Sequence, residues 1–249
     1  SIAAGKFDLV IATPPCNLRS RVVYNNRNGP KPVRSKDHPW GFPWLSIADR
    51  KKTDISNVLM RFTIEALKTA AAVKFSCKSR VTRGFLEFPE DLGKANLGSP
   101  ASAWQLPELR IDGHVRRAFN QCTAAGTPYQ KPTGTYSDIE FGWMVEGWPV
   151  HDESGRYTGP LPKHCGHDDH KVLLGKAADG SFVTEPTSYY PWRLSVRLAT
   201  GMASDWWHRL ASTGSPADWA DARPILATSK PAGEGLPGKL HVDEEDCEH

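Results

Sequence analysis

Two short apolar segments that each run into proline constrain the fold of this chain more than any other feature. Residues 7–12 (FDLVIA) precede Pro14 and Pro15, and residues 84–89 (GFLEFP) end in Pro89. Short apolar runs bounded by turn-forming residues are typical of buried strands. Proline ends such a strand because it has no N–H to donate to a neighbour. The sequence therefore predicts two buried strands, each with a stiff turn at its carboxyl end.

The segment between these strands has the periodicity of a helix. Residues 53–73 place a set of apolar side chains on one face, and Thr53 or Asp54 can cap the first turn. The predicted core face consists of Ile55, Val58, Leu59, Phe62, Ala66 and Leu67. A strand, a helix and a strand in this order predict an α/β fold with a partly parallel sheet. In such sheets reactive groups collect at the carboxyl ends of the strands.

The rest of the sequence predicts further strands and a second helix. We expect strands at residues 115–122 and 138–145 and a helix at residues 191–211, with a short helix or turn at residues 102–109. Residues 13–53 are rich in Pro, Gly, Arg and Asn, and we expect them to form a long ordered loop.

The composition indicates a globular chain. Its 249 residues are 39% hydrophobic and 24% charged, with a net charge of +3, so a sizeable core can form. From residue 212 the sequence is rich in Pro, Gly and Ala and ends in DEEDCEH. We therefore expect an α/β domain over residues 1–211 and an extended Pro/Gly-rich, acidic tail over residues 212–249.

Hydropathy and cysteine usage bear on where the protein works. No apolar run approaches the roughly 20 residues that cross a bilayer, so we expect no membrane span. The five cysteines are odd in number and widely spaced, unlike the disulfide framework of a small secreted protein. This usage favours a reducing intracellular compartment.

Cys16 follows the first strand directly after the two prolines. Two prolines stiffen the turn and fix the direction of the next side chain. A cysteine held in this way can act as a nucleophile if its thiolate is favoured, and Arg19 and Arg21 are near enough in sequence to lower its pKa. The alternative is a small buried cysteine that fills a turn. Glu87 ends the second strand, and we expect it beside Cys16.

These segments resemble two motifs of the cytosine-C5 DNA methyltransferase family. In that family a strand ends in Pro-Cys and the cysteine attacks C6 of a flipped cytosine, which is the role that DLVIATPPC implies for Cys16. The segment FLEFPED is similar to the next catalytic motif, whose glutamate hydrogen-bonds the cytosine edge, and Glu87 matches it. Phe88 and Pro89 stand where the family usually has Asn-Val. The resemblance covers about residues 5–200 and implies a Rossmann-like sheet with S-adenosylmethionine as cofactor.

The cofactor motif of that family is missing from the sequence. The family binds S-adenosylmethionine with a Gly-rich loop after an N-terminal strand, whereas the one nearby Gly-x-Gly here, residues 233–235, follows no strand. The Gln-x-Arg-x-Arg motif is not intact either. We therefore expect an incomplete methyltransferase-like sheet that is not active on its own. The alternative is a non-catalytic structural or interaction subunit of a larger assembly, ordered by neighbouring protein chains.

The densest group of metal ligands lies in KHCGHDDHK, residues 163–171. Cys165, His167 and His170 would bind Zn²⁺ with a fourth ligand from Cys122 or His164. The alternative is a solvated polar turn.

The basic residues of the first loop make nucleic acid a candidate partner. Arg19, Arg21 and Arg34 are interleaved with Tyr24 and Trp40. Such a mixture suits phosphate contacts and base stacking. The alternative is a basic loop that is simply solvated.

Overall fold

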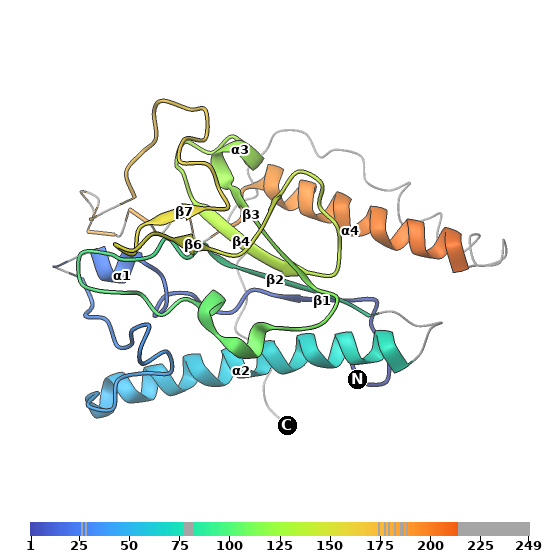
Figure 1. Ribbon diagram of the computed structural model, residues 1–249, viewed down its shortest axis with the longest axis horizontal. Coiled ribbons are helices and arrows are strands. Elements are labelled where there is room, and N and C mark those ends of the chain that lie inside the picture. Colours follow the sequence, from blue (N-terminus) through green and yellow to red (C-terminus); the bar gives the residue numbers. More distant parts are fainter. Residues whose placement is uncertain are drawn as a thin grey trace, which may run out of the picture. The chain divides into compact units, whose positions relative to one another are not determined.

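A five-stranded mixed sheet lies at the centre of the computed structural model (Figure 1). The model describes residues 1–25, 27, 29–76, 82–173, 175–176, 178, 180–181, 183–184, 187 and 189–213. The strand order is β1-β2-β4-β3-β5. The strands are β1 (Leu9–Ala12), β2 (Arg83–Pro89), β3 (Val115–Asn120), β4 (Pro132–Ser137) and β5 (Val145–Glu146), with a separate hairpin of β6 (Val150–His151) and β7 (Tyr157–Gly159).

The sheet is parallel at one edge and antiparallel elsewhere. β1 pairs in parallel with β2, whereas β4 runs antiparallel to both β2 and β3. The helices are α1 (Val22–Asn25), α2 (Ile47–Ser76), α3 (Gln121–Ala125) and α4 (Trp192–Thr213), with short 3₁₀ turns η1 (Ala103–Gln105) and η2 (Pro107–Leu109). This confirms the predicted α/β fold with a partly parallel sheet.

Two helices cover opposite faces of the sheet (Figure 1). On one face α2 packs Met60, Ile64 and Leu67 against Leu86 and Phe88 of β2. On the other face α4 contributes Leu194 and Leu198, which pack with Phe85, Phe119 and Phe141. Successive side chains of a strand point to opposite faces, so β2 supplies both cores.

The buried face of α2 differs from the predicted one. The helix begins at Ile47 rather than at residue 53, and Ser46 Oγ accepts a hydrogen bond from the Asp49 N–H at 3.1 Å. The prediction was right for Ala66 and Leu67 but wrong for Ile55, Val58, Leu59 and Phe62, which are 40–70% exposed. The stripe that faces the sheet is Met60, Ile64, Leu67 and Ala71, spaced at helical intervals.

The predicted strand at residues 138–145 is also wrong. The chain turns there, and the central strand β4 precedes it at Pro132–Ser137. Its sequence, PTGTYS, contains proline and glycine, which weaken the strand signal. Gly134 is needed for close packing, because a Cβ there would lie 2.6 Å from Arg116 Nη2 and 2.7 Å from Trp104 Cζ2.

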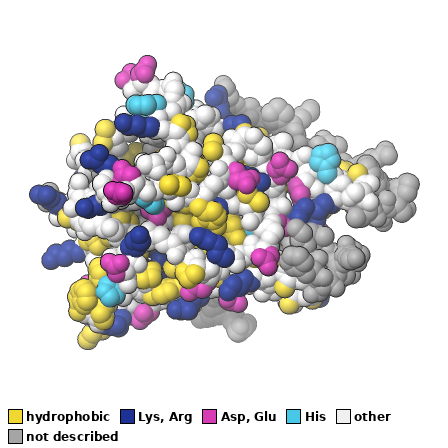
Figure 2. All heavy atoms as spheres, in the orientation of Figure 1, with side chains coloured by type: hydrophobic (Ala, Val, Ile, Leu, Met, Phe, Trp, Pro, Cys, Tyr) yellow, Lys and Arg dark blue, Asp and Glu magenta, His cyan; other side chains and the backbone are white. Residues whose placement is uncertain are grey.

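Residues 1–207 form one compact unit, and residues 208–249 are assigned to a second. The predicted tail lies outside the described residues from position 214, so its packing stays a prediction. Within the described part, no helix combines the length and hydropathy needed to cross a membrane. Figure 2 shows charged side chains of both signs scattered between hydrophobic ones on the face that it presents.

Candidate active site and candidate metal centre

Cys16 and Glu87 lie at the same end of the parallel strand pair β1 and β2. β1 and β2 are adjacent and parallel, with Ala12 opposite Leu86, so both residues occupy the carboxyl-end side of the pair. The chain turns tightly after β1, because the Cys16 carbonyl accepts hydrogen bonds from the N–H groups of Arg19 at 2.8 Å and Ser20 at 2.7 Å. Cys16 is half-buried and Glu87 is 9% exposed. The two side chains are near enough for the Glu87 charge to act on the thiol.

The Glu87 carboxyl is buried and held by a tyrosine. Tyr190, which precedes α4, donates its hydroxyl proton to Glu87 Oε2 at 2.7 Å. Burial raises the pKa of Glu87, and the Tyr190 hydrogen bond and the charge of Lys131 oppose this only in part. Glu87 therefore keeps a proton to higher pH than a solvated glutamic acid does.

The Cys16 thiol is shifted toward its neutral form. Burial and the Glu87 charge raise its pKa, and Lys131 lowers it. The cation that favours the thiolate is thus Lys131, not the neighbouring arginines to which the sequence pointed. Lys131 Nζ is fixed by donating to the Thr187 carbonyl at 2.6 Å.

The basic loop is folded into the protein. Arg19 and Arg34 are 2% and 0% exposed, so they do not form a solvated surface. The Arg19 guanidinium lies 5.1 Å from the Trp40 ring centroid, and Arg34 Nη1 donates to Asn57 Oδ1 at 3.1 Å. Burial lowers the pKa of Arg19 to about 9, with a further contribution from the Arg34 charge.

Arg21 is also hydrogen-bonded to another part of the chain. Its Nη2 donates to the Lys94 carbonyl at 2.7 Å, beyond the end of β2. Arg21 and Arg34 thus contact other parts of the chain, and Arg19 lies over Trp40. Their assignment to nucleic acid stays a prediction.

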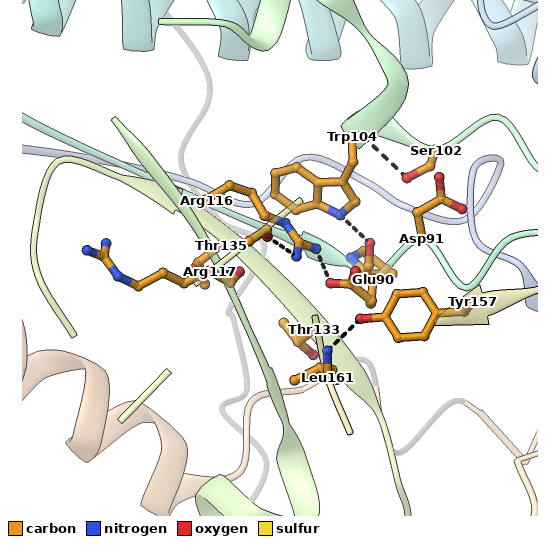
Figure 3. A network of polar contacts seen from close by, with 12 residues as sticks. Glu90, Asp91, Ser102, Trp104, Arg116, Arg117, Thr133, Thr135, Tyr157 and Leu161 are labelled. Carbon is orange, nitrogen blue, oxygen red and sulfur yellow. Dashed lines mark hydrogen bonds and ion pairs between the residues drawn. The ribbon is translucent and has the colours of Figure 1, made fainter. Parts of the chain in front are cut away.

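A buried polar network fixes the chain after β2 (Figure 3). Glu90 forms an ion pair with Arg116 of β3, and both side chains are fully buried. The Arg116 guanidinium lies 4.9 Å from the Trp104 ring centroid, and Trp104 Nε1 donates to the Pro89 carbonyl at 2.7 Å. The chain that follows Glu87 is therefore held by Trp104 at Pro89 and by Arg116 at Glu90.

Four potential metal ligands meet beside α3. Their ligand atoms all lie within 4.8 Å of one another, and they belong to Cys122, Cys165, His167 and His170. The Cys165 sulfur is 3.6 Å from His167 Nδ1 and 3.4 Å from His170 Nε2. Of the two fourth ligands considered from the sequence, the structure brings Cys122 into the group. Two thiols and two imidazoles form a donor set that tetrahedral zinc prefers.

Sequence reasoning missed Lys131 and Tyr190 as members of the site. Tyr190 is 103 positions from Glu87 along the chain, and no motif spacing connects them. Lys131 sits in the segment before β4, the strand that the sequence pattern did not identify.

Comparisons of the chain with protein-family models, with curated proteins and with solved structures give no match. The residues at the sheet edge therefore carry the functional proposal by themselves.

Proposed function

We propose that this chain is a cytosine-C5 methyltransferase-like domain in which Cys16 adds to C6 of a cytosine ring. The supporting observation is the placement of a thiol and a buried, proton-retaining carboxyl on the ends of adjacent parallel strands. A base in a duplex would have to leave the stack to reach them.

In the proposed addition, Cys16 supplies the nucleophile and Glu87 supplies a proton. The Cys16 sulfur, having lost its proton to solvent, forms a bond with C6. The C5=C6 π electrons move to C4–C5, the C4=N3 π electrons move to N3, and N3 takes the proton from Glu87. The product is a covalent adduct with a nucleophilic C5, and Tyr190 then donates to the carboxylate that remains.

The electrostatics suit such a cycle. Burial and the Glu87 charge raise the pKa of the Cys16 thiol, which favours its neutral form before the base arrives. Lys131 stabilises the thiolate that must form, and it also stabilises the Glu87 carboxylate after proton transfer. One cation therefore serves both charged states of the site.

The fold supports a Rossmann-like assignment, because α2 crosses over between parallel strands whose carboxyl ends carry the site. The residues do not fit S-adenosylmethionine in the same way. No Gly-x-Gly loop directly follows β1, β2 or β3. We therefore assign no methyl-transfer step to these residues and propose that the chain alone is inactive in methylation.

Exchange of the cytosine C5 hydrogen tests the addition step without a methyl donor. Addition at C6, protonation of C5 and reversal release tritium from [5-³H]cytosine in a pool of random-sequence DNA, both duplex and single-stranded. We expect release by the native chain, none by Cys16→Ser, and a loss of roughly 100-fold or more for Glu87→Gln. Cys247→Ser is the matched control and should exchange normally.

Two results would contradict the addition chemistry: no exchange by the native chain, or unchanged exchange by Cys16→Ser. Either result would favour the alternative, a non-catalytic structural or interaction subunit.

We also propose that Cys122, Cys165, His167 and His170 bind a structural Zn²⁺, since four protein ligands leave no open position for catalysis. Metal analysis should find about one zinc per chain, consistent with a closed four-ligand site. Cys165→Ser should lose it, and His164→Asn, next to the group but not in it, should retain it. A metal-free native protein whose stability is unaffected by chelator would exclude this site.

A further inference from the structure

A groove on the α4 side of the sheet takes no part in the proposed addition chemistry. It has a volume of about 580 Å³, within the range of ligand sites. Its walls include Trp143, Trp192, Arg193, Val196 and Arg197. It is formed where α4 passes the segment between β4 and β5.

One wall of the groove is ordered by aromatic packing. Trp143 makes an edge contact with Phe119 at a centroid distance of 5.1 Å, and the Arg197 guanidinium lies 4.1 Å from the Trp143 ring centroid. Arg197 is itself fixed, because its Nη1 donates to the Ala124 carbonyl of α3 at 3.3 Å. The ring and the cation are thus positioned in advance.

The other wall presents an open aromatic face. Trp192, which lines the groove, is 79% exposed. An indole that is exposed to this extent contributes little to the stability of the fold, and its face is available for stacking.

The charge of the groove points to an anionic ligand. Arg193 and Arg197 are the charged residues of the described lining, which contains no carboxylate. Aromatic faces interleaved with arginines are what single-stranded nucleic acids bind, since bases stack and phosphates contact the cations.

The groove begins next to the candidate active site. Tyr190 bonds Glu87, and only Pro191 separates Tyr190 from Trp192. A base that enters the site leaves its neighbours on the same strand near this segment. We infer that the groove binds unpaired nucleotides that flank the target base, with a base stacked on Trp192 and phosphates facing Arg193 and Arg197. This assignment to flanking nucleotides rests on the proposed function.

Binding of an adenine-only strand separates the groove from the addition chemistry. A fluorescein-labelled single-stranded dA₁₂ has no pyrimidine for Cys16 to attack. We expect the native chain to bind it, and the affinity to fall as salt is raised. Trp192→Ala should weaken binding roughly five-fold or more, the loss of one stacked base, and Arg193→Ala combined with Arg197→Ala should flatten the salt dependence.

Matched controls lie elsewhere on the molecule. Trp44 is 70% exposed, and Trp44→Ala and Arg50→Ala should leave dA₁₂ binding unchanged. Trp192→Tyr keeps an aromatic face and should retain most of the affinity, which shows that any loss in Trp192→Ala is not misfolding.

The outcomes are distinct. Unchanged binding in Trp192→Ala, or no binding by the native chain at low salt, overturns the groove assignment. Displacement of dA₁₂ by an equal nucleotide concentration of dAMP makes the groove a mononucleotide site and overturns the strand assignment. Normal dA₁₂ binding without cytosine exchange means that the proposed function fails, and the assignment to nucleotides flanking a target base falls with it.

Discussion

The charge of Lys131 lowers the pKa of both Cys16 and Glu87. Because burial and the Glu87 charge raise the Cys16 pKa, alkylation of Cys16 by iodoacetamide should be slower at neutral pH than that of a free cysteine. The pH at which the alkylation rate reaches half of its maximum should be higher for Cys16 than for a free cysteine. Glu87→Gln should move the midpoint down and Lys131→Met should move it up. Mass spectrometry of the Cys16 peptide gives the rates, and shifts of the opposite sign would show that these groups do not control the thiol.

Glu87 also links stability to pH. Its pKa is raised in the folded state, so the folded chain binds more protons than the unfolded chain above the ordinary glutamate pKa. This contribution to stability is complete at low pH and is lost as the pH rises through the folded pKa. Native protein should therefore lose stability relative to Glu87→Gln, in urea unfolding, as the pH rises from the ordinary glutamate pKa through the raised pKa of the folded state. Parallel profiles for the two proteins would contradict the assignment.

At the scale of the elements, α2 has one face that holds the fold and another that does not. Leu67 is fully buried, so Leu67→Ala should lower the free energy of unfolding by about 2–5 kcal/mol. Phe62 is 70% exposed, and Phe62→Ala should change it by no more than about 0.5 kcal/mol. Chemical denaturation measures both. A large loss in Phe62→Ala would mean that this face is covered.

Elements with a clear local signal were predictable. The strand that ends at Pro89 and the helix after Pro191 lie close to their expected bounds, since proline marks one end of each. The face of α2 was not predictable, because both faces carry large apolar residues and the sheet selects between them. β4 was missed because its buried position depends on Gly134 packing under Trp104, a tertiary contact.

The candidate site divides in the same way. The nearness of Cys16 and Glu87 follows from a βαβ unit, which the sequence predicts. Lys131 and Tyr190 come from segments that reach the sheet edge only after the whole fold has formed. The burial of Arg19 and Arg34 likewise depends on how the loop packs, because a run of basic residues is typical of a surface.

At the scale of the molecule, the proposed zinc ligands join two distant segments. The metal would hold Cys165, His167 and His170 against α3, and the adjacent Ala124 carbonyl anchors Arg197 of the groove. Removal of metal by chelator should therefore lower the unfolding temperature and weaken dA₁₂ binding together. Thermal unfolding and anisotropy on the same sample test this, and readdition of Zn²⁺ should restore both. Unchanged dA₁₂ binding after zinc loss would uncouple the metal from the groove.

The position of β1 has a consequence for how the site can be completed. In the described part of the chain, β1 has a hydrogen-bonded neighbour on one side only, and Ile11 within this strand is 56% exposed. Its outer N–H and C=O groups form a template on which another strand can add by backbone pairing. A strand added there would end next to the turn that holds Cys16. Cys16 therefore lies where a further polypeptide segment, paired with β1, can complete the site without any change to the existing strands.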